Sequence, residues 1–182
     1  MKYESIDSKL FIKNRANFSK EMKKNSIAFF NSNDIYPVSA DSTLPFEQHR
    51  DIFYLSGIDQ EESILVLSPD NPNPDLREIL FLKETSDHIA VWEGPKINKS
   101  QALKISGIKT VFWLNDLEKI INKLVNRCEN IYFNKNEHYR AKIETETREA
   151  RFNSWLENKY SKKNKERSNP ILQRLRSLKD PI

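Results

Sequence analysis

The chain has 182 residues, of which 37% are hydrophobic, 10% aromatic and 31% charged. This length suits one domain with a linker, and the aromatic content argues against a disordered chain. The net charge of +4 comes from 30 basic and 26 acidic residues, a balance too even to predict a nucleic-acid partner. The single cysteine, Cys128, excludes an internal disulfide and a cysteine-rich zinc site, and its apolar neighbours predict a buried structural thiol.

The N-terminus carries no apolar segment typical of a signal peptide. No stretch approaches the roughly 20 apolar residues that a membrane-spanning helix needs. We therefore expect a cytoplasmic protein without a membrane partner.

The first predicted elements are a helix, a strand and a loop. Residues 8–24 place Phe11, Phe18 and Met22 on one helical face, and Ser8 is the expected N-cap. Residues 26–30 form an apolar run that predicts a buried strand. The next sixteen residues, up to position 46, are rich in turn formers and predict a loop.

Residues 45–58, "PFEQHRDIFYLSGI", combine a polar half with an aromatic half. The polar half, Glu47 to Asp51, is interpreted as a loop. The aromatic half, Phe53 to Leu55, is interpreted as a strand that anchors this loop in the core, with Gly57 releasing the chain. The segment therefore looks built to hold a polar loop at a fixed place.

The middle of the chain predicts several strands. Residues 63–68 are dense in branched apolar side chains, as in a central strand. A turn with three prolines at 69–75 leads to a second strand at 78–83, and the two strands form a hairpin or a strand return. Residues 88–94 are a third apolar run, also predicted as a strand, which ends at Gly94.

The next segment alternates helix and strand. A helix is predicted at 98–106 and a short strand at 110–114. Asn115 and Glu118 have the spacing of a capping box, ahead of a helical apolar stripe between positions 117 and 125. Residues 130–133 complete the set as a last strand.

The C-terminal part is predicted to be helical and to lead into a further part of a longer chain. Residues 137–160 are highly charged and predict one long helix, and 162–169 read as a linker. Residues 170–182 predict a helix with a strong apolar face that nothing obvious in this chain would cover. The interleaved pattern predicts an α/β fold with about six strands, arranged as a mixed central sheet flanked by helices.

Motifs for a self-contained active site are absent from the sequence. It has neither a nucleophile elbow nor a glycine-rich phosphate loop, and His49, His88 and His138 are scattered. Asp87 and His88 beside Glu84 could bind a metal weakly, although a solvated cluster is favoured there. The residues alone therefore predict a soluble α/β domain without its own catalytic centre.

Residues 40–67, "ADSTLPFEQHRDIFYLSGIDQEESILVL", resemble the N-terminal domain of aminopeptidase P and its relatives, the prolidase and creatinase family. That family carries the signature P-[FY]-x-Q-x-x-[DN]-[FI]-x-Y-L-[TS]-G, which residues 45–57 match. Residues 80–97 resemble the following family segment with its W-x-G motif, here Trp92 to Gly94. The terminal "LQRLRSLKDPI" resembles the family's junction into a catalytic domain. At 83–85 the sequence "KET" departs from the family's usual arginine.

The resemblance implies a two-domain enzyme of which this chain is the first half. Residues 1–160 would be the N-terminal domain of creatinase type, and residues 161–182 a linker and the start of a pita-bread catalytic domain. That second domain would hold two Mn²⁺ ions or another divalent metal, and would release the N-terminal residue before proline. The implied parent is a metallo-aminopeptidase, and this fragment alone is expected to be inactive.

The resemblance also implies three site residues, and each of them also has a simpler structural explanation. Trp92 would reach toward a neighbouring subunit's active site; the simpler explanation is a tryptophan in the core. Asp41 would lie near the same active-site mouth; the simpler explanation is a role in forming a turn. Arg167 could match an inter-domain arginine of the family; the simpler explanation is a charged side chain exposed to solvent. The implied partners are the catalytic domain, further copies of the chain, and proline-containing peptides.

Three alternatives stay open at this point. The same fold without catalysis occurs in histone-chaperone subunits as a peptide- or protein-binding module. A prolidase, which cleaves only dipeptides, carries a similar first domain. A nucleic-acid binder would use the basic residues between 159 and 167, and its affinity would fall steeply with salt.

Overall fold

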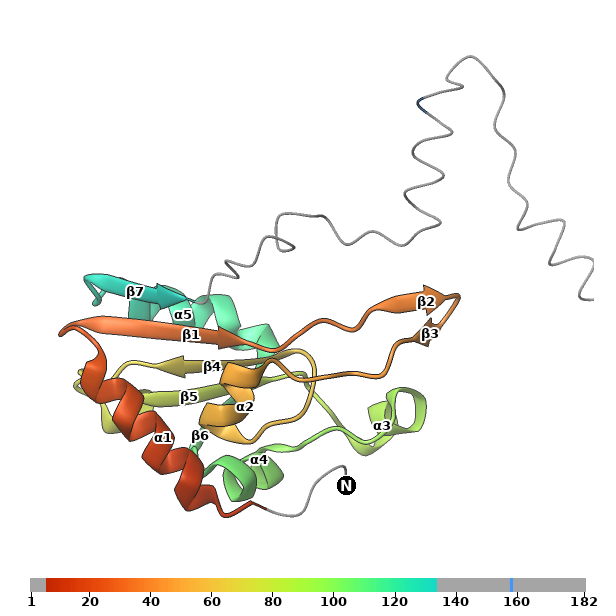
Figure 1. Cartoon of the computed structure of the whole chain (residues 1–182), viewed down its shortest axis with the longest axis horizontal. Helices are drawn as coiled ribbons and strands as arrows, with labels where there is room; N and C mark the ends of the chain where they lie inside the picture. Colours follow the sequence, from red (N-terminus) through yellow and green to blue (C-terminus); the bar gives the residue numbers. More distant parts are fainter. Residues whose placement is uncertain (1–5, 134–157, 159–182) are drawn as a thin grey trace, which may run out of the picture. The chain divides into compact units, whose positions relative to one another are not determined.

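A computed structural model of the chain describes residues 6–133 and Asn158 (Figure 1). Apart from Asn158, the predicted helices at 137–160 and 170–182, the linker between them and the domain boundary at 160 lie outside the described residues. These remain predictions.

A five-stranded mixed sheet forms the centre of the fold, with strand order β6-β5-β4-β1-β7. Its central strand β4 pairs antiparallel with both neighbours, while the outer pairs β5–β6 and β1–β7 are parallel. The strands are β1 (Ser26–Asn31), β4 (Ser63–Leu67), β5 (Glu78–Leu82), β6 (Thr110–Trp113) and β7 (Asn130–Phe133). The five strand segments predicted at these places, the central position of 63–68 and the α/β class are confirmed. The sheet has five strands where about six were expected.

Helices cover both faces of this sheet (Figure 1). Helices α1 (Ser8–Glu21), α2 (Arg50–Ser56) and α4 (Lys99–Ser106) contribute to one apolar cluster with β1, β4 and β5, whereas α5 (Leu117–Val125) contributes to the other. Neighbouring residues of one strand divide between the two clusters, as Leu65 and Val66 do. This alternation is the period-two pattern of a strand with two buried faces.

The predicted N-cap of helix α1, Ser8, is instead the first residue of the helix. Asp7, not Ser8, is the N-cap, because its carboxylate accepts a hydrogen bond of 2.9 Å from the Lys9 amide. The helix also ends at Glu21 rather than at residue 24. Its predicted apolar face is confirmed, since Phe11 is buried and Phe18 packs edge-to-face on Phe30 at 5.2 Å.

Helices α2 and α4 end in the same way, on the sequence Ser-Gly-Ile. In both, the serine hydroxyl donates to the carbonyl four residues back and accepts from the amide two residues on. The glycines, Gly57 and Gly107, adopt left-handed conformations with φ of 70° and 74°. Arg15 of α1 donates to the carbonyls of Leu55 and Ser106 near both ends, so one side chain ties three helices together.

The predicted strand at Phe53 to Leu55 is wrong, because these residues belong to α2. Ile52 and Leu55 are buried three residues apart, while Tyr54 between them is 59% exposed. That spacing puts both buried side chains on one helical face, which a strand could not do. The proposed division survives in altered form: a loop up to His49 precedes a short helix that anchors it.

The predicted strand at 88–94 is also wrong, because it forms helix α3 (Asp87–Glu93). The Ser86 hydroxyl accepts from the Ile89 amide and caps the helix. Val91 is 76% exposed, so the apolar run does not mark a core strand here. Helix capping outweighs the strand preference of the branched residues.

Two further predictions need correction. The loop predicted up to residue 46 contains a small hairpin of β2 (Pro37–Ser39) and β3 (Ser42–Thr43). The capping box at Asn115 and Glu118 does not form. Asn115 lies in a 3₁₀ turn, η2 (Leu114–Asp116), and α5 starts without a side-chain cap. The capping box forms instead at α4, between Asn98 and Gln101.

The remaining element is a 3₁₀ turn, η1 (Pro74–Leu76), inside the predicted proline turn. No helix in residues 6–133 is both long and apolar enough to cross a bilayer.

Candidate functional site

One end of the sheet gathers the segments in which the sequence places candidate residues. The strand pairing puts the C-terminal ends of β1 and β5 beside the N-terminal end of β4. From this end leave the β2–β3 hairpin, the loop 57–63 and the segment that carries α3 (Figure 1). The signature residues 45–57 lie between the hairpin and that loop. We take this end of the sheet as the candidate functional site.

Gln48 holds the signature segment against the loop 57–63. Its side-chain amide nitrogen donates to the carbonyls of Ile58 and Gln60 at 3.0 and 2.9 Å and lies 3.5 Å from the Ser63 hydroxyl. Its amide oxygen accepts from the His49 backbone at 2.8 Å. A glutamine suits this position because it supplies a donor and an acceptor together.

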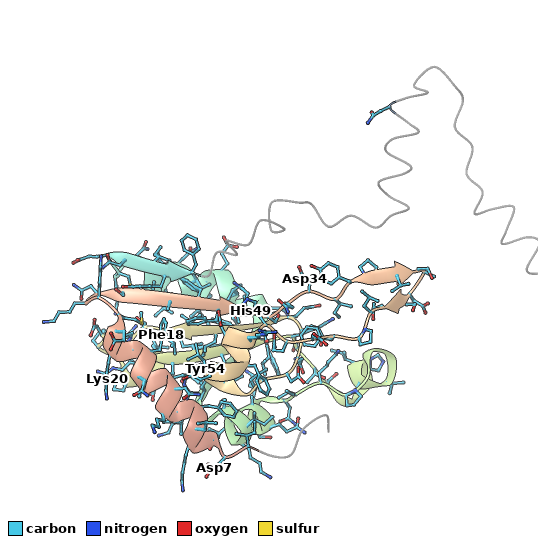
Figure 2. All side chains as sticks on the ribbon, in the orientation of Figure 1. Asp7, Phe18, Lys20, Asp34, His49 and Tyr54 are labelled. Carbon is cyan, nitrogen blue, oxygen red and sulfur yellow. The ribbon has the colours of Figure 1, made fainter. Side chains whose placement is uncertain are left out.

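Helix α2 starts directly after Gln48 and fixes the far end of the segment. The His49 ring nitrogen Nδ1 accepts from the Asp51 amide, so the histidine is the N-cap. Figure 2 labels His49 at this helix start and Tyr54 on the helix itself. The signature residues therefore act mainly through local structure: Gln48 ties a loop, His49 caps a helix and Gly57 ends it.

The loop 57–63 also holds the segment that follows α3. The Gln60 side-chain oxygen accepts from the Ile97 amide at 2.6 Å, and Gln60 is buried. The Glu61 carboxylate forms an ion pair with Lys96, and these side chains are only 11% and 18% exposed. Paired charge offsets the cost of burying Glu61 and Lys96, and the hydrogen bond from Ile97 satisfies the Gln60 oxygen, whereas the Gln60 side-chain nitrogen has no partner among the described residues.

The hairpin exposes several apolar side chains. Both of its strands are exposed along their length, and a two-stranded hairpin is marginally stable by itself in water. The exposed apolar residues in and beside it are Ile35, Tyr36, Val38 and Leu44. Figure 2 labels Asp34 on the segment that leads into β2. Such a group of apolar side chains is typical of a surface that meets another protein surface.

The three predicted site residues have different outcomes. Asp41 is exposed at the turn of the hairpin, between β2 and β3. Trp92 lies in α3, and its side chain is outside what the structure describes. Arg167 lies outside the described residues altogether. Asp41 and Trp92 therefore lie on segments that leave the same end of the sheet. Their functional roles remain predictions.

Among the side chains that the structure describes, no group of three or more His, Cys, Asp or Glu lies together. The Asp87 side chain is outside these, so the weak metal site considered at Glu84, Asp87 and His88 stays a prediction. The Glu84 carboxylate accepts from Asn115 at 3.2 Å.

Cys128 lies away from this site, on the other face of the sheet. It is partly buried against the apolar cluster to which α5 contributes. Its thiol donates to the Leu124 carbonyl at 3.4 Å. The residue also borders a cavity of about 40 Å³, too small for a peptide. The predicted structural role fits this packing, although the thiol is less buried than expected.

The pKa of the Cys128 thiol is raised by its burial and by the negative charge of Asp70, while a hydrogen bond with Ser68 opposes the rise. We expect iodoacetamide to alkylate the folded chain more slowly at pH 8 than the urea-unfolded chain, because only the thiolate reacts. The thiol's contribution to stability is complete below its unfolded pKa, about 8.5, and is lost as the pH rises through the folded value. Equal alkylation rates in the two states would contradict this assignment.

Comparison with known proteins identifies the family and the fold of the chain. The family model of the aminopeptidase P N-terminal domain matches residues 11–132. Xaa-Pro aminopeptidase 3 of Homo sapiens is 26% identical over 153 residues, which is 82% of this chain and 29% of that protein. The chain thus spans less than a third of the length of this curated relative.

Solved structures of aminopeptidase P contain the same fold. A putative aminopeptidase P from Bacillus anthracis superimposes with a TM-score of 0.68 at 25% identity, over 94% of this chain and 40% of that one. Zinc-substituted Escherichia coli aminopeptidase P in complex with product gives a TM-score of 0.65 at 22% identity, over 76% of this chain and 31% of that chain. The match of the family model across most of the described fold shows that the chain belongs to the aminopeptidase P N-terminal domain family.

Proposed function

We propose that the chain is the non-catalytic first domain of a Xaa-Pro aminopeptidase, a hydrolase that removes the residue preceding proline from peptides. Its role is to shape the active-site mouth and to mediate contact between subunits. The observation that carries this proposal is the signature segment 45–57, which Gln48 ties into a loop that also holds the α3 segment. The match of the family model over residues 11–132 supports the same function.

The reaction itself belongs to a second domain in this proposal. That domain would hold two divalent metal ions, Mn²⁺ in the first instance, which would supply Lewis-acid chemistry for peptide hydrolysis. The zinc-substituted Escherichia coli enzyme is a metal-containing relative of the same fold. The described residues of this chain contribute geometry around the mouth rather than metal ligands.

Two surfaces would make the mouth and the subunit contact. The hairpin offers Asp41 at its turn and exposed Tyr36 and Val38 beside it. Helix α3 carries Trp92, whose large amphipathic ring suits a contact with another chain. Both leave the end of the sheet that the signature segment fixes, so a partner seated there would meet both. We propose a cytoplasmic homo-oligomer on this basis.

The proposal is tested by peptide hydrolysis with and without Mn²⁺. The 182-residue chain alone is expected to cleave nothing, because the proposal assigns the metal ions and the chemistry to the second domain. A longer product of the same gene is expected to release the first residue of Xaa-Pro-Xaa peptides only when metal is present, and to sediment as an oligomer.

Each other outcome has a distinct meaning. Metal-dependent cleavage by the 182 residues would disprove the assignment of chemistry to a second domain. Cleavage of Gly-Pro but not of longer peptides would show a prolidase. Peptide binding without any cleavage by the longer protein would show a binding module of the same fold.

A further inference from the structure

The loop 57–63 contacts both segments that frame the candidate site. On one side it accepts hydrogen bonds from Gln48, at the carbonyls of Ile58 and Gln60. On the other side its Gln60 side chain accepts from the Ile97 amide, and its Glu61 pairs with Lys96. The loop thus lies between the signature segment and the chain that leaves α3.

We infer that the loop 57–63 sets the position of α3 relative to the signature segment, and that Gln60, Glu61 and Lys96 are positioning residues for the helix that carries Trp92. The inference deepens the function proposed above, since it rests on α3 belonging to the active-site mouth. It assigns that placement to a buried polar contact rather than to apolar packing of α3 itself.

Helix α3 needs such a tether because none of its described side chains is buried. It has seven residues, far fewer than an isolated helix requires for stability in water. Its Val91 side chain is 76% exposed. A helix of this kind keeps its place mainly through the chain segments at its two ends.

The two ends of this segment are held very differently. Before α3, Lys83 lies 3.5 Å from the Glu62 carboxylate, and these side chains are 31% and 50% exposed. After α3, the Lys96–Glu61 pair is largely buried beside the buried Gln60. An exposed ion pair contributes little, whereas losing one member of a buried pair leaves an uncompensated charge. Losing the buried Lys96–Glu61 pair is therefore expected to loosen α3 more than losing the exposed Lys83–Glu62 pair.

The adjacent residues Glu61 and Glu62 provide a matched test by amide hydrogen exchange. In Glu61→Gln, the amides of residues 86–97 are expected to exchange about tenfold faster, because the buried Lys96 loses its partner. In Glu62→Gln, the same amides are expected to keep their wild-type rates. The free energy of global unfolding should stay close to wild type in Glu62→Gln, and in Glu61→Gln it should fall by no more than about 1.4 kcal/mol, the equivalent of a tenfold change, because β4 and β5 are not altered.

Two substitutions at Lys96 separate positioning from general damage. Lys96→Met should reproduce the local effect of Glu61→Gln, and it serves if the latter fails to fold. Lys96→Arg keeps the charge and should retain protection of residues 86–97. Rescue by the arginine is the result that loss of packing alone would not give.

The inference is overturned if Glu61→Gln and Glu62→Gln change residues 86–97 equally, or if exchange in β4 and β5 accelerates more than exchange in residues 86–97. Either result would mean that the buried pair does not control α3 in particular. These outcomes are read from exchange rates in the 182-residue chain. Failure of the proposed function would instead appear in the peptide assay of the longer protein, so the two are distinguishable.

Discussion

Replacing Arg15 by methionine is expected to lower the free energy of unfolding by about 3–5 kcal/mol, mainly because two buried carbonyls lose their hydrogen-bond donor. Its guanidinium is fully buried beneath α1 and lies 2.9 Å from the Glu78 carboxylate. It also donates to the carbonyls of Leu55 and Ser106 at 2.8 and 3.0 Å. Methionine keeps an apolar stem of similar length but supplies no donor to either carbonyl.

The magnitude follows from what the substitution leaves behind. Two buried carbonyls near the ends of α2 and α4 would lose their donor, at a cost of about 1–3 kcal/mol each. The Glu78 carboxylate is 35% exposed, so water replaces part of its lost partner. The loss should therefore come mainly from the helix ends and less from the charge pair.

Urea unfolding of the 182-residue chain measures this effect. Lys13→Met on the same helix is the matched control, because Lys13 is exposed, and it should change the free energy of unfolding by less than about 0.5 kcal/mol. Arg15→Lys should recover only part of the loss, since a lysine cannot present the same fork of donors. If Arg15→Met and Lys13→Met were equally stable, the assigned role of Arg15 would be wrong.

Arg15 also shows why the sequence predicts strands better than buried polar contacts. The strands at 26–31 and 63–67 are dense in apolar residues, and this signal lies within a few neighbouring positions. The partners of Arg15 lie 40 and 91 residues away in sequence. A basic residue on the apolar face of α1 gives no local sign of which carbonyls it will meet.

The two strand predictions that failed share a physical cause. The runs at 53–55 and 88–94 are short and contain aromatic or branched residues, which favour strands. Both are helices because of their ends: His49 and Ser86 cap them, and Gly57 terminates the first. The sequence signal for a helix was the cap residue beside each short run, although the composition of the run itself favours a strand.

The candidate site was predicted only in part. The resemblance pointed to the signature segment and to Asp41, while Gln60, Glu61 and Lys96 were missed. Glu61 and Glu62 look alike in sequence, as two adjacent acidic residues typical of a solvated turn. Only the fold shows that Glu61 is largely buried against Lys96 while Glu62 faces solvent.

The second large effect is expected at Gly57, the last residue of the signature. Gly57→Ala should lower the free energy of unfolding by about 2–4 kcal/mol, as the sum of backbone strain and overpacking. The backbone there has φ of 70°, and a Cβ atom would lie 2.4 Å from Cε2 of the Phe11 ring. Phe11 is buried and packs edge-to-face against Phe53 at 6.3 Å, so its ring has little freedom to move away.

Gly107 is a closely matched control, because it ends α4 in the same way with φ of 74° and ψ of 4°, against 70° and 6° at Gly57. The alanine Cβ at Gly107 would meet Cδ1 of Ile12, the flexible end of an exposed side chain. Gly107→Ala should therefore cost mainly the backbone strain, about 1–2 kcal/mol. The difference between the two variants isolates the contact with Phe11.

A double-mutant cycle with Phe11→Leu tests that contact directly. Leucine removes the ring atoms that the new Cβ would strike, so the cost of Gly57→Ala should shrink by about 1 kcal/mol or more in the Phe11→Leu background. The same background should leave the cost of Gly107→Ala unchanged, since Ile12 is a different residue. Equal costs for the two glycine variants, together with no coupling to Phe11, would show that backbone strain alone dictates glycine at the end of the signature. A measured coupling would show that the signature's last residue is glycine because α1 packs its phenylalanine directly against the end of α2.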